Sequence, residues 1–317
     1  MRAKTLLLLC LAIFGQAPSW ATTPTLRDAA TLATPSLEGT AASHCCDTLN
    51  SIPHISMPND PLPLAPAVKL AIVIDDIGNS YRKGLDAIAL PGNITYAVMP
   101  HRKHSKTLAE RAARLGKEVI LHAPMATQNG RTLGAGALTP DLDEFTFKAK
   151  LRFAIDSIPY ATGINNHMGS LLTTQLTPMQ WVMDVLQEKR LFFVDSRTHA
   201  HSVAYATALS SGVATANRDV FLDHEINIER IHIQFKRALA IAEQYGSAIA
   251  IGHPHTETIT YLSHVLPQLD DSRVQLHYVS DLIKQGIQTR PDSARETRPI
   301  QSPSLDALVA ELRTPAT

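Results

Sequence analysis

Between residues 67 and 287, short β-rich runs alternate with longer stretches whose apolar residues recur at helical spacing. Strands separated in this way by helices pair in parallel, so the pattern predicts a parallel α/β fold. Seven or eight such units either close a (β/α) barrel or form an open doubly wound sheet, and the pattern alone leaves both open. The expected strands are 69–74, 94–99, 118–121, 161–165, 191–194, 247–251 and 274–279, with 213–215 as a further candidate.

Two of the expected helices have recognisable sequence signals. Thr177 precedes Pro178 and is followed three positions later by Gln180, which predicts Thr177 as the N-cap and a glutamine that completes a capping box. A second helix is expected at 226–242, where apolar residues recur at helical spacing. Each helix lies between two expected strands, as the alternating fold requires.

The residues that flank this region differ from it in composition. Residues 1–21 combine a charged start, a short apolar run and small residues before the cleavage position, which predicts a secretory signal peptide. The apolar run is about half of the roughly 20 residues that a membrane-spanning helix needs. We therefore expect an exported protein, periplasmic or secreted, without a transmembrane segment. Residues 22–66 are expected to be a disordered linker and 288–317 a flexible tail around one domain at 67–287.

Composition argues against two classes of protein. The formal net charge is zero and 18% of the residues are charged, so the basic surface that nucleic-acid phosphates require is not expected. Once the signal peptide is removed, Cys45 and Cys46 remain, and adjacent cysteines are badly placed to form a disulfide with each other. They either cross-link two chains or have no role, so disulfides do not organise this fold.

The first expected strand ends in two adjacent acids, Asp75 and Asp76. Two carboxylates beside an apolar interior are costly unless a cation or hydrogen bonds compensate for their burial. A turn in which one acid caps the following helix, near Asn79 or Ser80, leaves the other acid unexplained. A nearby divalent metal explains both, because one aspartate can bind it while the other serves as a base.

Histidines end two further expected strands, His122 after 118–121 and His167 after 161–165. Either ring alone is equally well explained as a structural residue that holds a loop by a hydrogen bond. Together with an aspartate of the first strand, they make a set of one carboxylate and two imidazoles, which suits Zn²⁺ with positions open for water and substrate. The sequence therefore predicts a divalent-metal site, with zinc as the expected ion.

His253 follows the strand expected at 247–251 and precedes a proline. Because histidine titrates near neutral pH, His253 is a candidate general acid, and a structural turn histidine is an equal alternative. Three residues at other strand ends are candidates either for binding substrate or for holding a neighbouring group in place, namely Asn166, Asp195 and Arg197. The alternatives are a turn residue for Asn166 and a salt-bridged strand end for Asp195 and Arg197. The remaining histidines near strand ends are expected at the rim, namely His101, His104 and His255.

Five segments, in order along the chain, resemble blocks of the divergent polysaccharide deacetylase family. They are 71–78 (AIVIDDIG), 120–125 (ILHAPM), 163–170 (GINNHMGS), 193–197 (FVDSR) and 250–255 (AIGHPH). The resemblance covers essentially the whole expected domain. It implies a distorted (β/α) barrel of about seven strands, related to chitin and peptidoglycan deacetylases.

The resemblance also implies a role for each candidate residue. In the wider superfamily the first aspartate of such a pair is the catalytic base, the second binds the metal and a histidine on a late strand is the acid. These roles fall on Asp75, Asp76 and His253. His122 would be a ligand, but ordinary deacetylases take a second one from a His-x-x-x-His segment, and the fourth residue after His122 is an alanine. We expect His167, from the next strand, to replace it.

The function implied by the resemblance is metal-dependent removal of acetyl groups from an N-acetylated envelope or extracellular polysaccharide. Another metal-dependent amide or ester hydrolysis could use the same groups. The arginine-bearing motif of ordinary deacetylases is missing between the fourth and fifth strands. Its absence favours an alternative, a non-catalytic envelope barrel that binds glycan or protein.

Overall fold

The computed structural model describes residues 67–285, all of which belong to one compact unit of the chain. The predicted signal peptide (1–21), linker (22–66) and tail (288–317) lie outside the described residues. Every expected strand is present, with one addition. The strands are β1 (Val68–Ile77), β2 (Ile94–Val98), β3 (Glu118–Met125), β4 (Ala161–Met168), β5 (Phe192–Asp195), β6 (Thr215–Asn217), β7 (Val220–Phe221), β8 (Ser247–Gly252) and β9 (Val274–His277).

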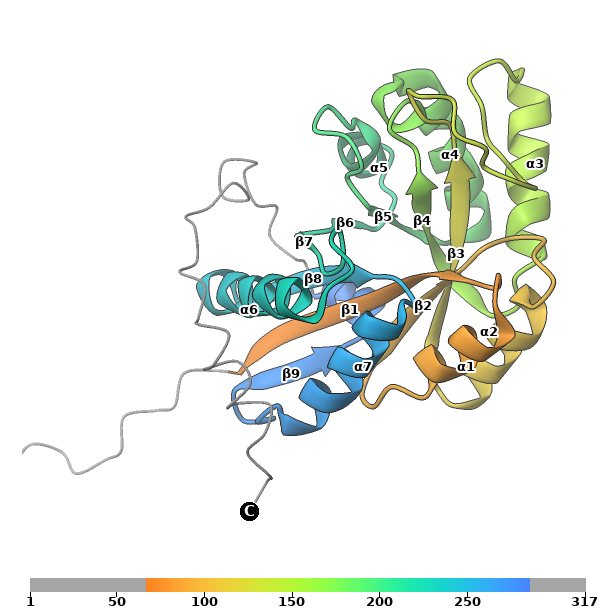
Figure 1. Cartoon of the computed structure of the whole chain (residues 1–317). Coiled ribbons are helices and arrows are strands. Elements are labelled where there is room, and N and C mark those ends of the chain that lie inside the picture. Colours follow the sequence, from red (N-terminus) through yellow and green to blue (C-terminus); the bar gives the residue numbers. More distant parts are fainter. Residues whose placement is uncertain (1–66, 286–317) are drawn as a thin grey trace, which may run out of the picture. The chain divides into compact units, whose positions relative to one another are not determined.

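Helices follow most of the strands, and neighbouring helices pack in pairs, α1 with α2, α3 with α4 and α6 with α7 (Figure 1). Two short 3₁₀ turns, Leu172–Thr174 and Leu266–Gln268, accompany them. The helices are α1 (Tyr81–Ile88), α2 (Ser105–Arg114), α3 (Glu144–Asp156), α4 (Leu176–Lys189), α5 (Ala204–Ser210), α6 (Ile228–Tyr245), α7 (Thr256–Val265) and α8 (Val279–Lys284).

All strand pairs of the described residues are parallel, in the order β6-β5-β4-β3-β2-β1-β8-β7. The last strand, β9, pairs with the first residues of β1. It lies on the same edge of β1 as β2, which pairs with the later residues of that strand. Only Arg218 and Asp219 separate the two outermost strands, β6 and β7, so the two edges of the sheet must lie near each other. The sheet therefore curls into the predicted distorted (β/α) barrel, which is confirmed.

Successive strand residues point to opposite faces of the sheet, and both faces are buried. One face packs against the helices and carries the larger core, for example Leu70, Ile72 and Ile74 of β1. The other face lines the barrel with smaller residues, for example Ala71 and Val73. Residues that continue this inner alternation past the end of a strand therefore lie at the mouth of the barrel.

The opposite, amino-terminal end of the barrel is closed by α8. Its Val279 and Leu282 are buried in the inner cluster. The backbone N–H of Val279 donates to Thr95 Oγ1 at 3.3 Å, and Thr95 in turn donates to the buried carboxylate of Glu118 at 2.8 Å. This end is therefore filled by α8, whereas the functional candidates follow the carboxyl ends of the strands.

The fourth helix differs from its expected form. It begins at Leu176, with Gln175 in the N-cap position and no capping hydrogen bond from a side chain. The prediction of Thr177 as the N-cap is therefore wrong. Pro178, the third residue of the helix, is tolerated in this first turn because the first backbone N–H groups of a helix have no intrahelical acceptor.

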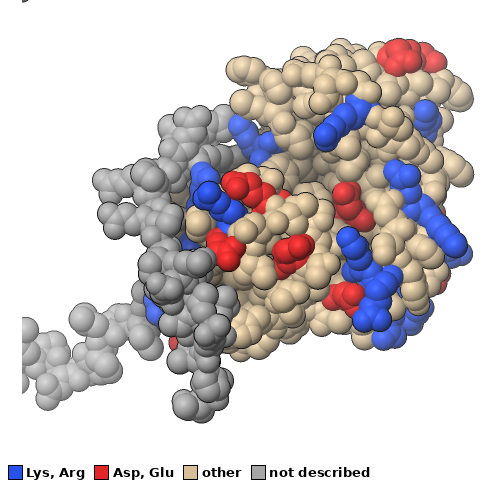
Figure 2. Space-filling view, in the orientation of Figure 1, with Lys and Arg blue, Asp and Glu red and all other residues tan. Residues whose placement is uncertain are grey.

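Charged side chains of both signs are interspersed on the face shown in Figure 2, which agrees with a formal net charge of zero. Between residues 67 and 285, no helix combines the length and the apolar character needed to cross a membrane.

Candidate functional site

The end of β1 brings both of its aspartates to the barrel mouth. In a regular strand, Asp75 and Asp76 would point to opposite faces. The pairing of β1 with β2 shifts register between Ile74 and Ile77. This shift marks a β-bulge at the two aspartates that lie between them. Asp76 also has a φ of 57°, a left-handed conformation that costs a non-glycine residue about 1–2 kcal/mol. This local strain turns Asp76 toward the side of the sheet that Asp75 already faces.

The helix that follows these aspartates has its own cap. The side chain of Ser80 accepts a hydrogen bond from the backbone N–H of Lys83, at 3.4 Å. Ser80 occupies the N-cap position of α1, so neither Asp75 nor Asp76 caps this helix. The capping explanation for the acidic pair therefore does not apply.

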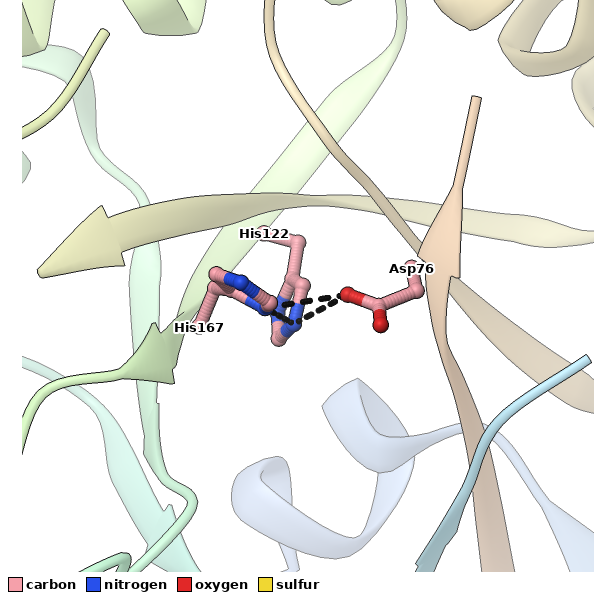
Figure 3. Close-up of side chains that lie close together, drawn as sticks. All are labelled: Asp76, His122 and His167. Carbon is pink, nitrogen blue, oxygen red and sulfur yellow. Dashed lines mark hydrogen bonds and ion pairs between the residues drawn. The ribbon is translucent and has the colours of Figure 1, made fainter. Parts of the chain in front are cut away.

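Asp76, His122 and His167 point their polar atoms at one another from β1, β3 and β4 (Figure 3). Asp76 Oδ1 lies 2.9 Å from His167 Nδ1 and 3.3 Å from His122 Nε2, and the two ring nitrogens are 3.0 Å apart. Ligands bound to tetrahedral zinc at 2.0–2.1 Å stand about 3.3 Å from each other. The triangle is therefore close to the size of one face of a zinc coordination sphere.

The electrostatics of this triangle also fit a cation. Asp76 Oδ1 is buried and has no hydrogen bond of acceptable geometry among the described residues. Burial raises the pKa of Asp76, but its close contacts with His122 and His167 outweigh burial and hold the pKa far below its ordinary value. Burial alone would lower the pKa of His122. The carboxylates of Asp75 and Asp76 have the larger combined effect, so the pKa of His122 is raised. The donor set of one carboxylate and two imidazoles fits a Zn²⁺ ion.

Asp75 lies beside the triangle. It is 2% exposed, accepts a hydrogen bond from Asn165 Nδ2 at 2.8 Å, and its Oδ2 is 3.6 Å from His122 Nε2. Burial raises the pKa of Asp75 above its ordinary value, although His122, His253 and Asn165 each lower it. A buried carboxylate with a raised pKa next to a metal-binding group is suited to accept a proton.

His253 follows β8 and is held by a residue that sequence reasoning missed, Asp223. His253 Nδ1 lies 2.9 Å from Asp223 Oδ1, and the His253 backbone N–H donates to Asp223 Oδ2 at 2.6 Å. Thr258 Oγ1 donates to the same oxygen at 2.7 Å. Burial lowers the pKa of His253, but the carboxylates of Asp223, Asp75 and Asp76 outweigh it and raise the pKa to about 9.

The three residues expected to bind substrate or to hold neighbouring groups lie at the ends of β4 and β5. Asn166 donates to the Met168 carbonyl at 2.7 Å and accepts from the Ser196 backbone N–H at 2.9 Å. Asp195 accepts from the backbone N–H of Arg197 and, through its other oxygen, from the hydroxyl of Ser202. The bond between Asn166 and Ser196 joins β4 to the loop after β5, and the bonds of Asp195 hold that loop at the end of β5.

A second residue missed by sequence reasoning, Asn165, lies among the site residues. It is fully buried, and its side chain contacts both Asp75 and His122. Alternation could have identified it, because Ile164 belongs to the helix-facing core and the next residue must then face the barrel interior.

Comparisons with known proteins agree with this architecture. A family model described as divergent polysaccharide deacetylase matches residues 72–283. Uncharacterized protein YibQ of Escherichia coli is 40% identical over 203 residues, which are 64% of this chain and 64% of that protein, so less than two thirds of its length is covered. An uncharacterized protein of Haemophilus influenzae is 36% identical over 203 residues, 64% of this chain and 72% of that protein.

Among solved structures, that of uncharacterized protein ATU2773 from Agrobacterium tumefaciens has a TM-score of 0.66 at 23% identity, and covers 70% of this chain and 92% of that one. This likeness shows the fold. The family match extends from β1 to α8 and includes all the strand ends described above. The chain belongs to the divergent polysaccharide deacetylase family.

Proposed function

We propose that this chain is an exported, metal-dependent hydrolase that removes acetyl groups from an N-acetylated envelope or extracellular polysaccharide. The observation that carries the proposal is the placement of Asp75, a buried carboxylate with a raised pKa, next to the triangle of Asp76, His122 and His167. A base adjacent to a group of metal ligands is the arrangement that metal-assisted hydrolysis requires.

Asp76, His122 and His167 would hold the ion, most simply Zn²⁺. When bound, such an ion polarises a carbonyl oxygen and lowers the pKa of a water molecule. Asp75 accepts the proton of the attacking water, because it is the carboxylate beside this group and its pKa is raised by burial. Its bond from Asn165 keeps one carboxylate oxygen fixed.

His253 donates a proton to the departing amine. Its Nδ1 is bound to Asp223, which leaves Nε2 as the ring nitrogen available to a substrate. The pKa of about 9 keeps the ring protonated at neutral pH, as a general acid must be before the reaction. Asp223 acts through His253 and has no need to contact the substrate.

Two features support the choice of substrate and location. The family of this chain is that of the divergent polysaccharide deacetylases, and this family name supports a polysaccharide that carries acetyl groups as the substrate class. Residues 1–21 have the pattern of a secretory signal, which supports action in the periplasm or outside the cell, where such glycans are found. Asn166, Asp195 and Arg197 are proposed as residues of the substrate-facing loops.

The proposal is tested by acetate release. The mature protein, residues 22–317, is loaded with Zn²⁺ and incubated with chitin oligosaccharides and with peptidoglycan fragments, and free acetate and new amino groups are both measured. We expect equal amounts of the two products with wild type, and none after removal of the metal with a chelator. Asp75→Asn is the matched control, since it preserves shape and removes the base.

Other outcomes would decide against it. Hydrolysis of esters or other amides without acetate release from any N-acetylated glycan would establish the same chemistry on a different substrate. Glycan binding by a zinc-loaded protein that releases nothing would favour the non-catalytic barrel.

A further inference from the structure

Asn165 bridges two strands that are not neighbours in the sheet. It lies on β4, where it is paired in register with His122 of β3, and its side chain reaches Asp75 of β1. Its Nδ2 lies 2.8 Å from Asp75 Oδ1 and 3.4 Å from Ser196 Oγ, and its Oδ1 lies 2.7 Å from His122 Nδ1. The amide is fully buried, so these contacts account for its polar atoms.

The chemistry of these contacts allows one orientation of the amide. A carboxylate oxygen accepts hydrogen bonds, so the group that faces Asp75 must be the NH₂ of Asn165. The carbonyl oxygen of Asn165 then faces His122 Nδ1, and this nitrogen must carry a hydrogen to donate. In the neutral ring the lone pair is consequently on His122 Nε2, the atom that faces Asp76 and His167.

We propose that Asn165 is a positioning residue: its single amide fixes the ring of His122 in the tautomer that presents the Nε2 lone pair to a metal ion, and at the same time fixes the Asp75 carboxylate beside that ion. This inference rests on the metal site of the proposed function and adds a residue that couples ligand and base. Groups that hold the second nitrogen of a metal-bound histidine set its tautomer and orientation in just this way.

The neighbouring asparagine shows why a structural explanation is insufficient. Asn166, one position further on β4, bonds to the Met168 carbonyl and to the Ser196 backbone N–H, as expected of a residue that joins two loops. Asn165 instead has the side chains of the candidate ligand and base as its two closest partners. The cluster that lines the barrel interior is mostly aliphatic, so packing alone does not require an amide at this position.

Two substitutions separate the halves of the proposal. Asn165→Leu removes the acceptor for His122 and should weaken zinc binding about 10- to 100-fold, the usual effect of losing such a partner. Asn165→Asp has the same shape and keeps an acceptor for His122 Nδ1–H, but it places a second carboxyl group beside Asp75, with which it must share a proton. Its zinc affinity should therefore fall less than that of Asn165→Leu. Asn227→Ala is the control, because it removes an amide that caps α6 outside the site.

The experiment measures Zn²⁺ affinity by competition with a chromophoric chelator, and the ring tautomer of His122 by ¹⁵N NMR of the zinc-loaded protein. We expect a hydrogen on Nδ1 of His122 in wild type and in Asn165→Asp, and unchanged affinity in Asn227→Ala. Wild-type affinity in Asn165→Leu, equal losses in both Asn165 variants, or an Nε2–H tautomer in wild type would overturn the inference. A wild-type protein that binds no Zn²⁺ would overturn the metal site as well, whereas zinc binding without hydrolysis would contradict only the proposed function.

Discussion

Two groups of aspartate and histidine lie at the carboxyl-terminal mouth of the barrel, and they differ in how their carboxylates are satisfied. In the group of Asp76, His122 and His167, the carboxylate oxygen that faces both rings has no hydrogen bond of acceptable geometry from any residue between 67 and 285. In the group of Asp223, His253 and His255, Asp223 accepts from a ring nitrogen, a backbone N–H and a hydroxyl.

The difference shows how similar residue types acquire different roles. A carboxylate oxygen that faces two imidazoles and accepts no well-formed hydrogen bond is stabilised by a cation. A carboxylate whose oxygens are already bound to donors stabilises the protonated form of the histidine that it touches. We therefore propose metal binding for the first group, here called the ligand group, and proton transfer for the second, here called the acid group.

The largest expected effect tests whether the acid group and Asp75 act in catalysis. Asp75→Asn and His253→Ala should each reduce hydrolysis by about 10²- to 10⁴-fold, the contribution of a positioned base or acid. Both variants should keep their zinc, because neither residue belongs to the ligand group. Acetate release and metal content are measured on the same samples. Loss of metal from His253→Ala would mean that His253 also binds the ion, which would contradict the separate roles of the two groups.

A smaller effect concerns stability conferred by the metal. Zinc at 100 times its Kd should stabilise wild type by about 2.7 kcal/mol, which raises the Tm of a domain of this size by roughly 5–10 °C. His122→Ala and His167→Ala should lose this increase because each removes a ligand. His255→Ala, on the acid group, should retain it. Thermal unfolding with and without Zn²⁺ provides the measurement, and a full increase in His167→Ala would show that the second imidazole comes from elsewhere.

The acid group should also make stability depend on pH. The folded-state pKa of His253, about 9, lies above its ordinary value of 6.5, so its stabilisation is complete below pH 6.5 and is lost as the pH rises through about 9. This shift corresponds to at most about 3 kcal/mol, and exposure of 28% of the side chain reduces it to on the order of 1–2 kcal/mol. Denaturant unfolding of metal-free wild type and His253→Gln should show their difference shrinking from about pH 6 to about pH 9.5. A constant difference would exclude the ion pair.

The subtlest expected effect is on the titration of His253 itself. Asp223→Asn removes the nearest negative charge and should lower the pKa of His253 from about 9, while Asp75 and Asp76 continue to raise it. Asp195→Asn is the matched control, since its oxygens bind Arg197 and Ser202. Histidine titration by NMR distinguishes the two variants. An unchanged pKa in Asp223→Asn would mean that Asp223 does not tune the acid.

Much of the ligand group could be anticipated from sequence, because each of its residues ends a strand with a clear apolar run. Parallel strands gather their carboxyl ends at one mouth, so the sequence alone predicts that Asp76, His122 and His167 lie together. The bulge and positive φ that place Asp75 and Asp76 on one side could not be anticipated. Such backbone features depend on the register with β2, which the sequence does not display.

One member of the acid group, Asp223, could not be found by the same reasoning. Asp223 follows β7, which has two residues, Val220–Phe221, and a strand this short has no measurable periodicity. Asn165 was missed for a different reason, since the predicted strand ended at that residue while β4 continues to Met168. Within the longer strand, alternation directs Asn165 and His167 to the barrel interior and Asn166 away from it.

The most direct test of the central claim is the zinc content of two matched carboxamide variants, Asp76→Asn and Asp223→Asn. Both are purified in parallel with wild type, and the zinc bound per chain is measured by elemental mass spectrometry. Each changes one carboxylate to an amide of the same shape, one in the ligand group and one in the acid group. We predict about one zinc per chain in wild type and in Asp223→Asn, and a loss of zinc in Asp76→Asn. Zinc retained in Asp76→Asn and lost from Asp223→Asn would contradict the account, because the metal would then belong to the group that we assign to proton transfer.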